Sequence, residues 1–361
     1  MLKAGLWEQD IRLLPYGSIN YQEIFRLAQA QSITGLVTAG LEHAKDIKVP
    51  QESVFPFMSV VLSIEQQNAA MNHFIVEMIG KLREEGINSV LLKGQGIAQC
   101  YERPLWRASG DVDLFLDKEG FERAKIFFRP LVSKFDPDNE FAKSINMQYD
   151  SWIVEIHANQ YTGISSKIDK VLDEIHEDIF KNQDTRLWQN GSVNIDLPSA
   201  DNDVLLVFTH ILKHLYKGGI GLRQICDWVR LLWTYKDSID ISLLKKRLED
   251  MQLTTIWKAF GSLAVNILGI DSVAMPFYDS SQRWEKKSER LLSFILTTGN
   301  MGHNRDTSYY GRYPYLIRKM ISLYIRIKDV ICLSRIFPLD SLRFLYGITR
   351  NGVIDAVRFA K

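Results

Sequence analysis

The chain has 361 residues, of which 46% are hydrophobic and 24% are charged, and its formal net charge is +1. This length allows two or three domains, and the composition is that of an ordinary globular protein with a buried core. The near-zero net charge excludes a general attraction to nucleic acid or anionic membranes, although residues 311–361 hold ten Lys or Arg against three acidic residues.

The first residues, the cysteines and the apolar runs do not predict secretion or a membrane span. The first residues, MLKAGLWEQDIRLL, carry charges where a signal peptide needs a continuous apolar block. The three cysteines stand far apart, so neither a disulfide framework nor a zinc site is expected. No apolar run reaches the roughly 20 residues that span a bilayer, since charges at 326, 328 and 329 interrupt the nearest candidate. We expect a cytoplasmic protein without a membrane span.

Residues 1–85 are predicted to be an N-terminal helical region. The segment 53–86 carries apolar residues at steps of three and four and ends at Gly86, as an amphipathic helix should. We expect this helix to contribute packing and no chemistry.

Residues 86–198 are predicted to form an α/β core. Short apolar runs at INSVLL, DVDLFL, SINMQY, SWIVEIH and SVNIDL indicate strands, and GIAQCYE and KEGFERAKIFF indicate helices between them. FDPDNE is expected to be a surface turn.

Residues 199–361 are predicted to be a C-terminal helical domain. SADNDVLLVFTHILKHLY begins with helix-capping residues, and GLRQICDWVRLLWTY follows the glycine-rich turn KGGIG. The expected fold is therefore an α/β (α+β) core with a mixed sheet, flanked by N-terminal helices and a C-terminal helical domain.

Asp111 and Asp113 form the Asp-x-Asp pair that opens the predicted strand DVDLFL. In a strand, residues i and i+2 face the same side, roughly 6.6 Å apart. Two carboxylates so placed repel each other unless a cation lies between them, and hard oxygen ligands suit Mg²⁺. Two further pairs, at 136/138 and 201/203, are explained by a turn and by a helix's first turn.

The preceding segment LLKGQGIAQCY reads as a strand, a tight turn and the start of a helix. Gly94 and Gly96 would let the backbone approach a ligand, and a helix N-terminus offers N–H groups to an anion. Lys93 lacks the spaced glycines of a Walker loop, so a P-loop is excluded. Phosphate at the turn and a metal on the aspartates would together make a nucleoside triphosphate site.

The segment 90–116 resembles the signature of the DNA polymerase β-like nucleotidyltransferase superfamily: strand, glycine turn, helix, then an acid-apolar-acid strand. More closely, it is similar to the uncharacterised bacterial nucleotidyltransferase family that begins with a Leu-Lys-Gly turn, with Arg107 before the strand at 110–114. Gln95 departs from the superfamily's usual turn of Gly followed by Gly or Ser. The resemblance covers residues 86–198 well, the start of the last segment fairly and the first segment hardly at all.

The resemblance implies a site as well as a fold. A third acid is expected on a later strand, and SWIVEIHANQY supplies Glu155, which otherwise reads as an exposed strand acid. The implied catalytic and metal-binding residues, for Mg²⁺ or alternatively Mn²⁺, are Asp111, Asp113 and Glu155. The implied nucleotide- and phosphate-binding residues are Lys93, Gly94, Gln95, Gly96, Arg107, Ser109 and Arg223.

The roles of four residues stay open: His157, His210, His214 and Asp227. His157 would share a strand face with Glu155 and orient a substrate or cap the sheet edge. His210 and His214 stand one helical turn apart, but no third metal ligand is evident, so packed histidines are favoured over a metal site. Arg223 and Asp227 have the same spacing and are expected to pair unless Arg223 reaches the triphosphate.

The predicted function is Mg²⁺-dependent transfer of a nucleoside monophosphate from a nucleoside triphosphate to a hydroxyl-bearing acceptor, with release of pyrophosphate. The acceptor could be a small molecule, a sugar, a protein side chain or an RNA end. Two alternatives stay open: a catalytically inactive nucleotide-binding or protein-interaction module on the same fold, and a kinase-like γ-phosphoryl transfer. Nucleic acid is not the expected partner, although base stacking would suit four C-terminal tyrosines. They are Tyr309, Tyr310, Tyr313 and Tyr315.

Overall fold

The computed structural model describes residues 1–136, 143–302, 304 and 312–347. The N-terminal region is helical, as predicted. Its helices are α1 (Leu2–Trp7), α2 (Tyr21–Ala30), α3 (Thr34–Glu42) and α4 (Gln51–Glu84). The long amphipathic helix is confirmed as α4, which ends two residues before Gly86, whose φ of +64° suits glycine. Of FDPDNE, residues 137–140 lie outside the described residues.

A five-stranded mixed sheet forms the centre of the α/β part. Its strands are β1 (Val90–Leu92), β2 (Asp111–Phe115), β3 (Lys134–Phe135), β4 (Ser144–Tyr149) and β5 (Trp152–His157). The spatial order is β1-β2-β5-β4-β3. Only β2 and β5 run parallel, and the other three pairs are antiparallel. The mixed sheet predicted from the sequence is confirmed.

The two faces of this sheet belong to different hydrophobic clusters. Val112 and Leu114 pack in one cluster with α4 and with α6 (Lys118–Phe128). Phe115, one residue on and therefore on the opposite face, packs in the larger cluster with the helices that follow the sheet. Asp111 and Asp113 have the same parity as Phe115, so they face those later helices.

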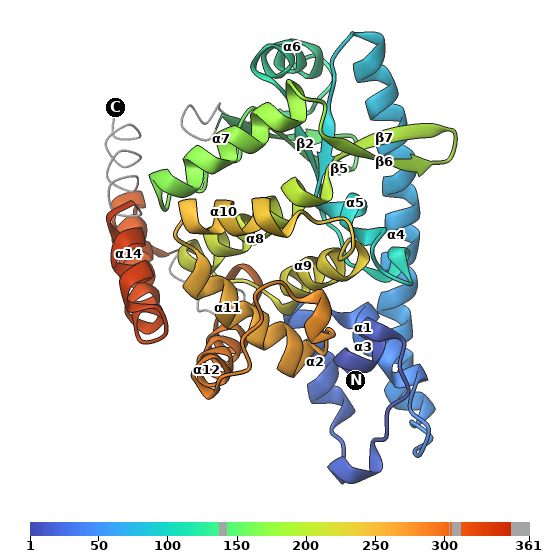
Figure 1. Ribbon diagram of the computed structural model, residues 1–361. Helices are drawn as coiled ribbons and strands as arrows, with labels where there is room; N and C mark the ends of the chain where they lie inside the picture. The colour runs from blue at the N-terminus through green and yellow to red at the C-terminus, as the bar shows by residue number, and fades with distance from the viewer. Residues whose placement is uncertain (137–142, 303, 305–311, 348–361) are drawn as a thin grey trace.

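Short elements complete the core. Helix α5 (Gly94–Ala98) follows β1, and α7 (Ser166–Phe180) follows β5. Strand β7 (Val193–Pro198) was predicted, but its partner β6 (Thr185–Asn190) was not; the two form a separate antiparallel hairpin. In Figure 1 this hairpin extends past α4, and β7 contacts both β1 and α4.

The C-terminal part is helical, as predicted. Its main helices are α8 (Ala200–Lys217), α9 (Leu222–Thr234), α10 (Ile241–Asp250), α11 (Thr254–Leu263), α12 (Gln282–Thr298) and α14 (Tyr315–Ser334). Helices α8 and α9 lie centrally below the sheet and α14 lies at the edge of the molecule (Figure 1). The larger cluster joins α1, α3 and the start of α4 to α8, α9 and α11. The boundaries at 85/86 and 198/199 fall between elements, and the domain division stays a prediction.

Within the described residues, no helix combines the length and the apolarity that crossing a bilayer requires. Cys100, Cys226 and Cys332 form no disulfide.

Candidate active site

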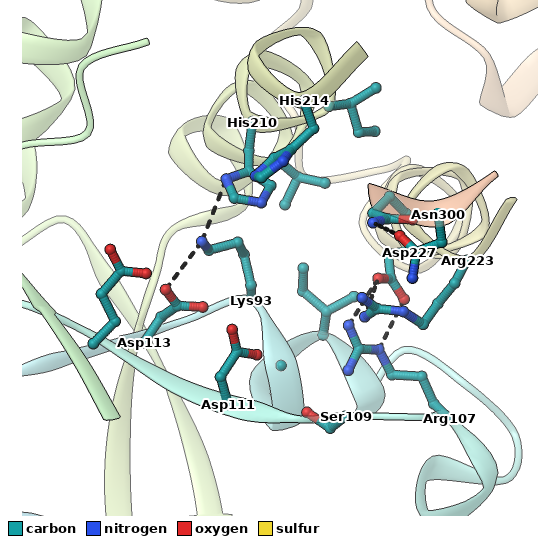
Figure 2. Close-up of a pocket in the computed structure, with 16 residues that line it drawn as sticks. Lys93, Arg107, Ser109, Asp111, Asp113, His210, His214, Arg223, Asp227 and Asn300 are labelled. Carbon is teal, nitrogen blue, oxygen red and sulfur yellow. Dashed lines mark hydrogen bonds and ion pairs between the residues drawn. The ribbon is translucent and has the colours of Figure 1, made fainter. Parts of the chain in front are cut away.

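A cavity of about 250 Å³ lies between the glycine turn, strands β2 and β5, and helices α8 and α9. Figure 2 shows Asp111 and Asp113 directed into it from β2, opposite His210 and His214 on α8. Most of the residues predicted for a nucleotide site line this cavity. They are Lys93, Gly94, Arg107, Ser109, Asp111, Asp113, Glu155 and Arg223.

The three predicted acids come together because of strand register. In the parallel pair, Asp113 lies opposite Glu155, and Asp111 lies two residues before Asp113 on the same face. Asp113 is buried, with 7% of its side chain exposed, whereas Glu155 keeps 26% exposed. The cavity therefore has one deeply held carboxylate and one that a ligand can reach more easily.

Two cationic or hydrogen-bonding partners hold Asp113. The Lys93 ammonium lies 3.2 Å from Asp113 Oδ1, and His157 Nε2 donates to the same oxygen at 2.9 Å. Burial alone would raise the pKa of the Asp113 carboxyl, but Lys93 and His157 outweigh burial and hold it well below its ordinary value. Repulsion from Asp113 raises the pKa of Asp111, and burial adds to that rise.

Asp113, Glu155 and His157 have the spacing of metal ligands. One donor atom from each lies within 4.8 Å of the other two. Two carboxylates suit Mg²⁺ or Mn²⁺, and an imidazole suits Mn²⁺ better than Mg²⁺. His157, whose role the sequence left open, thus belongs to the acidic cluster.

The glycine turn is strained at a residue that is not glycine. Lys93 has φ +50° and ψ −139°, a conformation that is costly for a residue with a side chain. Gly94 follows at φ +42°, and a Cβ there would lie 3.6 Å from Ser109 Oγ. The strained turn directs the Lys93 side chain into the cavity. There its ammonium contacts Asp113 on β2 and also donates to His210 Nδ1 on α8 at 3.4 Å.

Three expectations about this turn need correction. Helix α5 has five residues, so its dipole is small and positive charge must come from side chains. Gln95 is buried and donates to Asn68 Oδ1 on α4 at 2.7 Å, and it does not line the cavity. Gly96 is explained by packing, because a Cβ there would lie 2.7 Å from the Leu197 side chain. At Gln95 and Gly96, the backbone N–H groups stay candidates for phosphate contact, whereas the Gln95 side chain does not.

Arg107 is held by a carboxylate rather than free to face a phosphate. Its Nε and Nη2 donate to the two oxygens of Asp227 on α9 at 2.9 and 2.8 Å, and both side chains are at most 5% exposed. Tyr101 donates to Asp227 Oδ1 at 2.8 Å. Arg223, predicted to pair with Asp227, lies 3.5 Å from it with 22% of its side chain exposed. Arg223 is therefore the more available arginine of the two.

His210 and His214 line the α8 side of the cavity, and their ring centroids are 4.4 Å apart. Burial, with the nearby Lys93 charge, lowers the pKa of His210 well below its ordinary value. Burial and the charges of Lys213 and Lys93 lower the pKa of His214 to about 3. Both imidazoles are thus neutral at physiological pH.

Two polar residues that line the cavity, Gln224 and Asn300, were not predicted from the sequence. Asn300 accepts from Gln224 Nε2 at 2.9 Å and donates to Ser32 Oγ at 2.9 Å, so it links α9 to the N-terminal helices at the cavity wall. Nothing in the local sequence around residue 300 signals this position, because it depends on the packing of elements far apart in the chain.

Comparison with known families identifies the family of this chain. A family described as uncharacterised nucleotidyltransferase matches residues 17–269, which include every lining residue named above except Asn300. The match begins at residue 17, so it extends across most of the N-terminal region, which the sequence resemblance had hardly covered. No curated protein and no solved structure matches the chain. With 70% of its length matched, the chain belongs to this uncharacterised nucleotidyltransferase family.

Proposed function

We propose that this cavity binds a nucleoside triphosphate with a divalent cation and transfers the nucleotidyl group to a hydroxyl acceptor, releasing pyrophosphate. The observation that carries the proposal is the alignment of Asp111, Asp113 and Glu155 on one sheet face, opposite the cationic groups of Lys93 and Arg223. Carboxylates and cations facing one cavity match a ligand that combines metal and phosphate.

The acidic cluster fits a divalent cation. Asp113 and Glu155 lie side by side, and repulsion from Asp113 still raises the pKa of Asp111 although Lys93 lies close by. We propose that Asp111, Asp113 and Glu155 hold Mg²⁺, or alternatively Mn²⁺, with His157 orienting Asp113. When bound, such ions neutralise phosphate charge and stabilise the entering and leaving oxygens.

The phosphates would contact three side chains, one on the glycine turn, one just before β2 and one on α9. Lys93 and Arg223 supply positive charge at the cavity wall. Ser109 Oγ is buried without a hydrogen-bond partner and lies beside Gly94, whose missing side chain leaves the approach open. An unsatisfied hydroxyl in such a place suits a phosphate oxygen. Arg107 would act through Asp227, fixing α9 and with it Arg223.

Glu155 is the proposed base. The acceptor oxygen forms a bond to the α-phosphorus, its proton passes to a Glu155 oxygen, and the bond from the α-phosphorus to the bridging oxygen breaks as pyrophosphate leaves. Glu155 is more exposed than Asp113, whose lowered pKa makes it a poor proton acceptor. Positioning and charge neutralisation supply the remaining catalysis, and no covalent enzyme intermediate is needed.

Pyrophosphate release tests the proposal. The protein is incubated with Mg²⁺ and each common nucleoside triphosphate in turn, with a cell extract as acceptor source. We expect extract-dependent pyrophosphate from the wild type and from Asp237→Asn, a control acid with 85% of its side chain exposed. Asp111→Asn and Asp113→Asn should each lose it. Nucleotide binding without pyrophosphate in any protein would favour the inactive binding module, and ADP in its place would favour a kinase.

A further inference from the structure

Helix α14 carries an exposed apolar stripe. It lies at the edge of the molecule in Figure 1 and outside the matched family region, residues 17–269. Six of its large apolar side chains are 37–70% exposed. They are Ile317, Met320, Leu323, Tyr324, Ile327 and Ile331.

The stripe occupies one side of the helix. At 100° per residue its six members fall within an arc of about 120°. Among the side chains of α14 whose exposure is described, the most deeply buried apolar ones lie near its C-terminal end, where Val330 and Leu333 are at most 3% exposed. The residues of α14 before 329 whose exposure is described are all half-buried or exposed. The helix is thus packed most deeply near its C-terminal end and exposes the apolar stripe from Ile317 to Ile331.

The charge around the stripe is of one sign. Residues 312–328 contain five Lys or Arg and no acid. Lys328 and Arg335 are exposed, and their positions on the helix border the stripe. Asp329, the acid nearest to the stripe, is buried. An amphipathic helix with an exposed apolar, aromatic-bearing stripe that is bordered by cations has the composition of helices that lie in the headgroup region of a membrane.

We propose that α14 docks this protein on an anionic lipid surface, with the stripe in the acyl boundary and the cations at the headgroups. A second copy of the chain packed stripe to stripe would bring Lys328 and Arg335 against the same cations of its partner, which disfavours a symmetric contact. Nucleic acid would satisfy the cations and leave the aliphatic side chains against water. A lipid surface satisfies both the cations and the aliphatic side chains, and α14 would lie on it without spanning it.

Vesicle cosedimentation of the full chain tests the proposal. The vesicles are pure phosphatidylcholine or phosphatidylcholine mixed with phosphatidylglycerol, each at low and high salt. The stripe variant is Met320→Glu/Ile327→Glu. A matched control, Leu187→Glu/Val273→Glu, changes two apolar residues that are 62% and 90% exposed on other surfaces. Because all four sites are exposed, thermal unfolding should be unchanged in both variants.

We expect binding to the anionic vesicles only, weakened at high salt, abolished in the stripe variant and kept in the control. Lys328→Gln and Arg335→Gln should each weaken binding by about five-fold, the factor that one cation near an anionic surface contributes. Absence of wild-type binding to anionic vesicles would overturn the proposal, as would equal binding by the stripe variant. Self-association that only the stripe variant loses, without vesicle binding, would overturn it in favour of a second copy.

Discussion

Glu155 lies directly opposite Asp113 in the parallel pair formed by β5 and β2. The two carboxylates come from positions 42 apart in the chain, and strand register alone makes them neighbours. Since a one-residue slip in register would turn Glu155 to the other face, the apolar residues Val154 and Ile156, buried on that face, fix the acidic cluster. The site therefore depends on the same alternation that builds the sheet.

Breaking the Arg107–Asp227 pair should destabilise the fold. Arg107→Met leaves the Asp227 carboxylate buried without its bidentate partner, and we expect a loss of about 3–5 kcal/mol in the free energy of unfolding. Urea denaturation of the wild type and of Arg107→Met measures this loss in the free energy of unfolding. Lys181→Ala, which removes an exposed pair with Glu177, is the control and should change stability by less than about 1 kcal/mol. A small effect of Arg107→Met would show that the pair does not anchor α9.

Lys93 combines a strained backbone with a side chain that the site requires. Lys93→Gly relieves the positive φ, and Lys93→Met keeps the strain while removing the charge. We expect the glycine variant to be more stable than the methionine variant by about 1 kcal/mol or more in thermal or urea unfolding. Both should lose nucleotide transfer. Equal stability of the two variants would mean that this turn stores no strain.

Gly94 is predicted to be sensitive to a single added methyl group. Gly94→Ala places a Cβ at φ +42° beside Ser109 Oγ, so we expect a stability loss of about 1–2 kcal/mol and weaker nucleotide binding. Gly110→Ala is the matched control because a Cβ there meets nothing within 4 Å. Calorimetric titration with a nucleoside triphosphate would distinguish the two. Similar behaviour of both variants would remove Gly94 from the phosphate site.

His214 should make the protein sensitive to acid. Its pKa is lowered from 6.5 to about 3 in the folded state, so between these values the unfolded chain binds one proton that the folded chain does not. The free energy of unfolding should therefore fall by about 1.4 kcal/mol for each pH unit below 6.5 through this residue. His214→Gln should reduce the slope, whereas His73→Gln, at an exposed position, should not. An unchanged slope in His214→Gln would contradict the burial argument.

Local patterns predicted the elements that carry the chemistry. Alternation identified β2 and β5, helical periodicity and Gly86 identified α4, and the acid spacing identified Asp111 and Asp113. Each of these features depends on residues that are close together in the sequence, where backbone periodicity and turn chemistry determine the local structure. Strand β6 was missed because TRLWQN has one buried side chain and no clear alternation.

Contacts between distant elements could not be read from the sequence. The helical spacing of Arg223 and Asp227 predicted their ion pair, which the structure contains at 3.5 Å. The closer partner of Asp227, Arg107, is 120 positions away and could not be predicted. The Gln95 side chain, next to two glycines, turned toward Asn68 on α4. Each of these outcomes depends on which helix packs against the turn, which no local pattern encodes.

The most direct test of the central claim follows the label from a nucleoside triphosphate carrying ³²P at either the α- or the γ-phosphate. The wild type is incubated with Mg²⁺ and a cell extract, and Asp111→Asn serves as the inactive control. Nucleotidyl transfer predicts α-label in the acceptor and γ-label in pyrophosphate, both lost in the control. γ-Label in the acceptor, or no label in it although nucleotide binds, would contradict the account.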